Sequence, residues 1–178
     1  MTTIILASNN KDKVKEVKEI LKEYNIISLK DAGIDLDVEE NGTTFKENAT
    51  IKAKYWAEKL NMPVLAEDSG IEIDALNGYP GVYTKRCIEK LRPGAKANTD
   101  KPDELYPVLL ELMSESGNPS TQAKWVSAMA FIDSEKEVFA TEYLLGDMCP
   151  CTGERVFGFD QYFRPTGLNK TLSELSPE

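Results

Sequence analysis

The sequence predicts an α/β protein built on a twisted mixed β-sheet flanked by helices. In the first half of the chain, apolar runs typical of strands alternate with segments of helical periodicity. Later in the chain, two strand-like runs follow each other across a short polar turn, which indicates antiparallel pairing. A length of 178 residues fits one domain, residues 1–178, with a core of useful size.

The first half of the chain is expected to form two helices among several short strands. Apolar residues at helical spacing, such as Val14, Val17 and Leu21, predict the first helix, and the polar residues 8–10 are suited to cap it. In order, we expect a strand over 3–7, a helix over 11–24, a strand over 25–29, an acidic loop over 31–43, a helix over 44–60, and strands over 63–66 and 71–75.

The second half is expected to contain one helix and one hairpin. The run Asn-Gly-Tyr-Pro-Gly at 77–81 is a strong turn signal. A helix is expected over 103–115, and strands over 122–132 and 137–145 flank a polar turn at 133–136.

Between the strands expected at 63–66 and 71–75, Glu67 and Asp68 precede Ser69 and Gly70. We expect a tight turn here that presents adjacent carboxylates at the end of a strand, where α/β proteins commonly build their sites. Paired carboxylates suit a divalent cation or an activated water. A plain polar turn explains the same residues, because Asp, Ser and Gly are all common in turns.

Composition excludes several classes of function. A formal net charge of -9 argues against a broad nucleic-acid surface. The chain has no histidine, which removes Ser-His-Asp and Cys-His catalysis and argues against a catalytic zinc site. A metal held by oxygen, magnesium or alternatively manganese, is the kind that fits. The three cysteines form no even disulfide framework and are expected to be reduced thiols.

The N-terminus lacks the basic start and long apolar stretch of a signal peptide. No apolar run approaches the ~20 residues of a membrane span. We therefore expect a cytoplasmic protein with neither membrane nor nucleic acid as a partner.

Two segments suggest phosphate chemistry. Residues 7–13 place small polar residues and lysines at a helix start, an arrangement that favours anions, although a plain helix cap explains it too. In residues 39–49, Thr44 and Glu47 are spaced as a capping box, which leaves Glu39 and Glu40 without a local role. Lys52 is expected on the same helix face as Asn48.

Six motifs in series resemble the inosine triphosphate pyrophosphatase family over essentially the whole chain. They are Ser-Asn-Asn-Lys-Asp-Lys-Val-Lys-Glu from residue 8, Glu-Glu-Asn-Gly-Thr-Thr-Phe-Lys-Glu-Asn-Ala from 39, Ile-Lys-Ala-Lys from 51, Glu-Asp-Ser-Gly from 67, Gly-Tyr-Pro-Gly-Val-Tyr-Thr-Lys-Arg from 78, and Val-Phe-Gly-Phe-Asp-Gln-Tyr-Phe from 156. The resemblance implies an elongated α/β domain of two lobes with a nucleotide cleft between them. It also implies a magnesium-dependent homodimer that splits ITP, dITP and XTP into monophosphate and pyrophosphate.

The resemblance also implies roles for individual residues. Asp68 takes the position of the general base, Phe157 that of the aromatic residue that stacks on the base, and Asp160 lies near the base-recognition site. Glu40, Asp68 and Glu67 are the metal-ligand candidates. The remaining substrate-binding candidates are Ser8, Asn9, Asn10, Lys13, Lys52, Ser69 and Lys170.

The sequence departs from the family pattern at its C-terminal end. Gln161 follows Asp160 where the family usually has proline, and residues 152–156 replace a glycine-rich approach. The chain stops at Glu178, before the family's Ser-His-Arg segment, so we expect weaker purine selectivity. Two alternatives stay open: a Maf-type nucleotide pyrophosphatase with another base preference, and a nucleotide-binding relative that has lost turnover.

Overall fold

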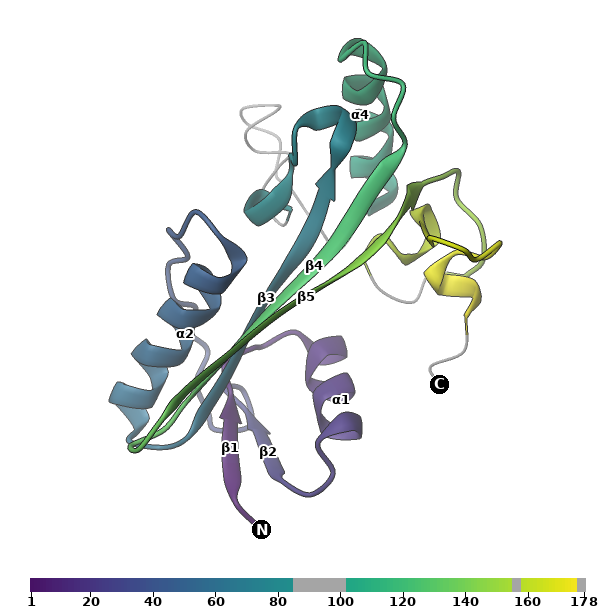
Figure 1. Ribbon diagram of the computed structural model, residues 1–178. Helices are drawn as coiled ribbons and strands as arrows, with labels where there is room; N and C mark the ends of the chain where they lie inside the picture. Colours follow the sequence, from purple (N-terminus) through teal and green to yellow (C-terminus); the bar gives the residue numbers. More distant parts are fainter. Residues whose placement is uncertain (85–101, 155–157, 176–178) are drawn as a thin grey trace. The chain divides into compact units, whose positions relative to one another are not determined.

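The computed structural model describes residues 1–84, 102–154 and 158–175 (Figure 1). Its six-stranded sheet has the order β2-β1-β3-β4-β5-β6. Strand β1 pairs in parallel with β2 and with β3, whereas β5 and β6 pair antiparallel, so the sheet is mixed. The α/β prediction is confirmed. The strands are β1 (Thr3–Leu6), β2 (Asn25–Ser28), β3 (Val64–Ile73), β4 (Gln122–Ile132), β5 (Glu137–Met148) and β6 (Phe163–Pro165), and the described α-helices are α1 (Lys11–Ile20), α2 (Phe45–Leu60) and α4 (Pro102–Glu115).

The chain forms two compact units. Unit 1 comprises Met1–Asp68 and Ser127–Glu142, and unit 2 comprises Ser69–Val126 and Tyr143–Glu178. Strands β3, β4 and β5 contribute residues to both units. Over the described residues, no helix combines the length and apolar character that crossing a membrane requires.

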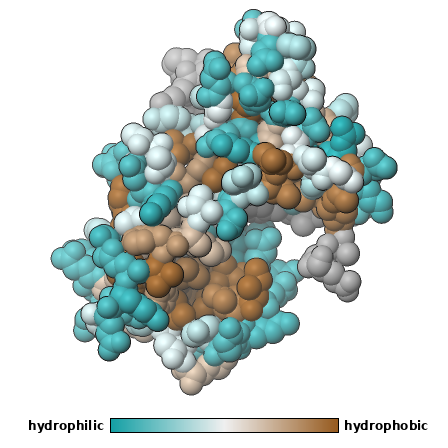
Figure 2. Space-filling model, in the orientation of Figure 1, coloured by the Kyte–Doolittle hydropathy of each residue, from teal (hydrophilic) through white to brown (hydrophobic). Residues whose placement is uncertain are grey.

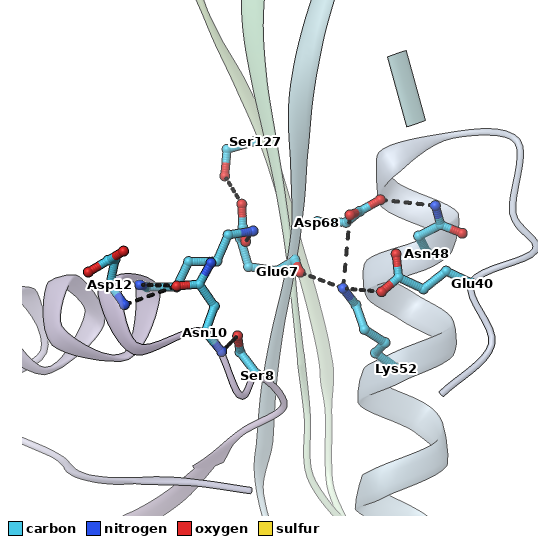
Figure 3. A network of polar contacts seen from close by, with 10 residues as sticks. Ser8, Asn10, Asp12, Glu40, Asn48, Lys52, Glu67, Asp68 and Ser127 are labelled. Carbon is cyan, nitrogen blue, oxygen red and sulfur yellow. Dashed lines mark hydrogen bonds and ion pairs between the residues drawn. The ribbon is translucent and has the colours of Figure 1, made fainter. Parts of the chain in front are cut away.

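Unit 1 has an apolar layer on each face of its sheet. Alternate residues of a strand point to opposite faces. Thus Ile5 packs with Ala53 and Trp56 of α2 in one buried cluster, whereas Ile4 packs with Val17 of α1 in another. Helices α1 and α2 therefore cover opposite faces of the same strands, and β3 lies between them (Figure 3).

Unit 2 has a core of its own. One face of α4, including Leu105 and Leu109, packs with Ile71 and Ile73 of β3 and with Phe163 of β6. The turn predicted at 77–81 is present, because Asn77 and Gly78 take positive φ values of 53° and 85°. These left-handed conformations reverse the chain just after β3.

The prediction of a tight turn at Asp68-Ser69-Gly70 is wrong. These residues lie inside β3, which is extended without interruption from Val64 to Ile73. Burial alternates through the segment: Asp68 and Gly70 are buried, and Glu67 and Ser69 are half-buried. Strand β4 lies along β3 in the sheet. We attribute the extended conformation to this pairing, which satisfies backbone groups and outweighs the local turn preference of Asp-Ser-Gly.

The other predicted elements are present with shifted ends. Helix α1 ends at Ile20 rather than at residue 24, because Leu21 leaves the helical conformation and a turn leads into β2. The hairpin between β4 and β5 forms as expected. Its turn is held by the Asp133 carboxylate, which accepts hydrogen bonds from the backbone N–H groups of Glu135 and Lys136 at 2.8 and 2.9 Å.

Candidate active site

The candidate site lies in unit 1, where β3 extends past the end of β1. The pairing of the two strands ends at Leu6 and Leu65, and the backbone N–H of Ala7 donates to the Leu65 carbonyl at 2.8 Å. Glu67 and Asp68 follow on β3, beyond that end. As consecutive strand residues they point to opposite faces of the sheet, Asp68 toward α2 and Glu67 toward α1 (Figure 3).

Asp68 is held by two side chains of α2. Its Oδ2 accepts a hydrogen bond from Asn48 Nδ2 at 3.0 Å, and its Oδ1 lies 3.9 Å from Lys52 Nζ (Figure 3). Only 9% of Asp68 is exposed. Burial raises the pKa of this carboxyl above its ordinary value, and the positive charge of Lys52 and the Asn48 hydrogen bond oppose the rise. The site thus holds a carboxylate with an increased affinity for a proton.

Lys52 places its ammonium among three oxygen atoms. Its Nζ donates to the Glu67 carbonyl at 2.8 Å and lies 3.0 Å from Glu40 Oε1, in addition to the longer contact with Asp68. Its side chain is 13% exposed. Lys52 is therefore an enclosed cation rather than a solvated residue of the helix surface. Glu39, the neighbour of Glu40, is exposed.

The start of α2 fixes these side chains. Thr44 caps the helix, and its Oγ1 accepts from the Glu47 N–H at 3.1 Å while the Glu47 carboxylate accepts from the Thr44 N–H at 3.2 Å. The predicted capping box is confirmed. Asn48 and Lys52 follow one turn apart on the same helix face, as expected from their i, i+4 spacing.

On the other face of β3, Glu67 forms an ion pair with Lys13 of α1. Its second carboxylate oxygen accepts from Ser127 Oγ at 3.2 Å. The pKa of Glu16, one turn further along α1, is raised by burial and by the charge of Glu67. The positive charge of Lys13 also opposes the rise in the pKa of Asp68, so the groups on the two faces influence one another electrostatically.

The residues before α1 cap that helix. Asn10 Oδ1 accepts from the N–H groups of Asp12 and Lys13 at 2.9 and 3.4 Å, and Ser8 Oγ accepts from the Asn10 N–H at 3.2 Å. The plain helix cap considered from the sequence is thus present. Among the described residues, Asn9 Oδ1 is the buried side-chain atom that lacks a hydrogen-bond partner.

The metal candidates separate into two groups. Glu40 and Asp68 direct oxygen atoms toward the ammonium of Lys52, and carboxylate oxygens are the ligands that a hard divalent cation prefers. The Glu67 carboxylate points to the other face and is engaged by Lys13 and Ser127. Within the described segments, no cluster of three or more Asp, Glu or Cys side chains is present, so a cation held by Glu40 and Asp68 would take further ligands from phosphate or water.

Four of the predicted site residues lie in unit 2 or outside the residues that the structure describes. Ser69 is half-buried in β3, and Asp160 begins a short 3-10 helix, Asp160–Tyr162. Lys170 is exposed, just before the buried Thr171. Phe157 lies outside the described residues.

Sequence reasoning did not assign roles to Asn48 and Ser127, the two uncharged partners of the carboxylates. The sequence does contain a feature that indicates Asn48: it is a polar residue four positions before Lys52, among the apolar positions of α2. No feature of the sequence indicates Ser127, because its contact with Glu67 depends on how β4 lies beside β3.

Comparison with known proteins confirms the resemblance drawn from the motifs. The chain belongs to the Ham1 family, whose sequence model matches residues 4–178. It is 38% identical over 177 residues to the dITP/XTP pyrophosphatase of Aquifex aeolicus (strain VF5), covering 98% of this chain and 86% of that protein. It is 36% identical over 179 residues to the dITP/XTP pyrophosphatase of Staphylococcus aureus (strain MRSA252), covering 100% and 87%.

Solved structures agree with this membership. The Ham1 protein of Staphylococcus aureus superimposes with a TM-score of 0.79 at 32% identity, covering 99% of this chain and 88% of that one. A HAM1 protein of Coxiella burnetii superimposes with a TM-score of 0.84 at 30% identity, over the same shares of both chains.

Proposed function

We propose that this chain is a nucleoside-triphosphate pyrophosphatase that hydrolyses the non-standard purine nucleotides ITP, dITP and XTP to monophosphate and pyrophosphate. Such a reaction clears damaged purines from the nucleotide pool. The observation that carries the proposal is Asp68, a buried carboxylate held by Asn48 and Lys52 just beyond the end of β1. Full-length similarity to proteins named dITP/XTP pyrophosphatase supports the substrate class.

Binding of the triphosphate is assigned to the groups that face the end of β1. The start of α1 presents the positive end of the helix dipole, with Ser8, Asn9 and Asn10 beside it. Lys13 and Lys52 supply full positive charges, which they share with carboxylates in the absence of substrate. Phosphate oxygens would compete for the same ammonium groups and so be drawn to the part of β3 that extends beyond the end of β1.

Asp68 is assigned as the general base. Its carboxylate would take a proton from water while the water oxygen bonds to phosphorus, and the P–O bond between the α and β phosphates breaks to release pyrophosphate. A raised pKa suits this role, because a base titrating nearer to neutral pH accepts a proton more readily. Lys13 and Lys52 would stabilise the charge that develops on the phosphates.

A divalent cation, magnesium or alternatively manganese, fits the oxygen donors of Glu40 and Asp68. Bound there, it would neutralise phosphate charge and polarise the bond that breaks. The carboxylate of Glu67 faces the other way and is better suited to hold Lys13.

Recognition of the base is assigned to Phe157, Asp160 and Lys170, with Ser69 as a further contact to substrate. In unit 2, Gln161 Nε2 donates to the Gly153 carbonyl at 2.9 Å. The Thr171 N–H donates to Glu174 Oε2 at 2.9 Å. These bonds brace the segments that carry Asp160 and Lys170. The whole chain, 1–178, is proposed to act as one catalytic domain of two lobes.

We also propose a homodimer, formed through β5. Every residue of β5 from 137 to 145 is exposed, including the apolar Val138, Tyr143 and Leu145, which are 51%, 63% and 53% exposed. Strand β6 pairs only with positions 146–148. Figure 2 shows apolar side chains exposed on the face of unit 1 that is turned to the viewer. An apolar strand left open in this way suits a second copy of the chain.

The proposed location is the cytoplasm, where the nucleotide pool lies.

The decisive experiment measures products from ITP, XTP, ATP, GTP and a modified pyrimidine triphosphate. We expect pyrophosphate, not orthophosphate, from ITP and XTP, and loss of activity with EDTA that added magnesium restores. Orthophosphate as the first product would refute the bond assignment. A preference for the pyrimidine would favour a Maf-type activity, and tight binding without products would indicate a binding protein.

A further inference from the structure

We propose that Asn48 is a positioning residue that couples the Asp68 carboxylate to the loop carrying Glu40. The inference rests on the proposed function and deepens it. Asn48 is 0% exposed, although its amide is polar and lies on the buried face of α2. Burying an amide without partners costs free energy, so its position must be stabilised by specific hydrogen bonds.

Both ends of this amide are engaged. Its nitrogen donates to Asp68 Oδ2 at 3.0 Å, and its oxygen accepts from the backbone N–H of Gly42 at 2.8 Å. One side chain thus links strand β3 to the loop before α2. Figure 3 shows Asn48 and Lys52 approaching Asp68 from the same helix, with Glu40 reaching Lys52 from the loop.

The loop passes unusually close to the helix at Gly42. A Cβ added there would lie 2.7 Å from Asn48 Oδ1 and 2.7 Å from Glu47 Cβ, so the position accepts only glycine without a shift of the chain. Glu40 stands two residues earlier, and its carboxylate lies 3.0 Å from Lys52. The hydrogen bond between Asn48 and Gly42 therefore fixes the point from which Glu40 reaches the site.

The consequence is a shared orientation of two carboxylates. Asn48 occupies Oδ2 of Asp68 and leaves Oδ1 facing Lys52, and through Gly42 it sets the approach of Glu40. Asn48 itself has no proton-accepting role here. Its effect on turnover is exerted through Asp68 and Glu40.

The test begins with Asn48→Asp. This change keeps the size of the side chain and the acceptor for Gly42, but it replaces the donor to Asp68 with a second carboxylate. We expect kcat on ITP to fall about 10–100-fold, the range typical of residues that orient the ligands of a site, with a much smaller change in KM. Asn25→Asp is the matched control, because Asn25 is exposed and its amide donates to the hydroxyl of Thr3 at 3.1 Å, at the start of β1. This control should keep wild-type kcat.

The exchange variant Asn48→Asp with Asp68→Asn separates positioning from simple stability. It restores a donor and an acceptor across the same gap with their roles reversed. We expect its melting temperature to return close to that of the wild type while kcat stays low, because the base has moved to the wrong residue. Hydrogen exchange at the Gly42 amide gives a readout without substrate: protection should persist in Asn48→Asp and disappear in Asn48→Ala.

Wild-type kcat in Asn48→Asp, or equal protection of the Gly42 amide in Asn48→Ala, would overturn the inference. A wild-type protein that releases no pyrophosphate from any nucleotide would instead refute the proposed function. In that case the exchange measurement at Gly42 still decides whether Asn48 holds the loop.

Discussion

Replacing Asp68 by asparagine removes the proposed base while keeping the shape of the side chain. The Asn oxygen can still accept the hydrogen bond that Asn48 donates at 3.0 Å, so the local packing is preserved. Loss of a general base typically reduces the rate by ~10²–10⁴. We therefore expect kcat for pyrophosphate release from ITP to fall by about that factor, with nucleotide binding retained.

The same substitution should not destabilise the fold, and its effect on stability should depend on pH. Burial raises the pKa of Asp68 above the ordinary value of 3.8, so between that value and the raised one the folded protein binds more protons than the unfolded chain. Wild-type stability therefore falls as pH rises through this window. Asn carries no such charge. The melting temperature of Asp68→Asn relative to wild type should rise across the window and then level off.

Two assays check these expectations together: steady-state kinetics at neutral pH, and thermal melts in steps from about pH 3.5 upward. Turnover within tenfold of the wild type would assign the base elsewhere, and the next candidates are Glu67, the neighbour of Asp68 in β3, and Asp74, which follows that strand. A melting temperature several degrees below wild type at neutral pH would show that the Asp68 charge stabilises the fold, contrary to its raised pKa.

Three further predictions follow from the same contacts. Lys52→Met should lower both turnover and stability, the latter by ~1–3 kcal/mol, because Glu40 and Asp68 lose the positive charge that both carboxylates face. A melting temperature unchanged from wild type would show that Lys52 is a solvated residue of the helix surface. Glu47→Ala should lower the free energy of unfolding above pH 4.5, the ordinary pKa of glutamate. This loss relative to wild type should vanish as pH falls through the pKa of Glu47, which hydrogen bonds from Thr43 lower. Denaturant unfolding at several pH values measures the loss, and a loss independent of pH would contradict the capping role. Leu145→Glu should convert the proposed dimer to monomer by light scattering, and an unchanged mass would move the interface away from β5.

The helices and the places where they begin could be predicted from sequence, because local signals determine them. Asn10 and Thr44 accept hydrogen bonds from the N–H groups of their own helices, and such contacts span only two or three residues. The hairpin turn at Asp133 is local in the same sense. The spacing of Asn48 and Lys52 likewise places them on one face whatever surrounds the helix.

Tertiary structure decided the conformation and surroundings of Asp68. Its sequence neighbours Ser69 and Gly70 favour a turn, yet the segment is extended, with β4 beside it in the sheet. Because a strand alternates its side chains, that outcome separates Glu67 from Asp68 and gives Lys13 to one carboxylate and Lys52 to the other. Contacts between residues 20 or 54 positions apart, such as Asn48 with Asp68 and Lys13 with Glu67, leave no periodic trace in sequence. They arise only when α1 and α2 pack on opposite faces of the same strands, because that packing brings the side chains within hydrogen-bonding distance.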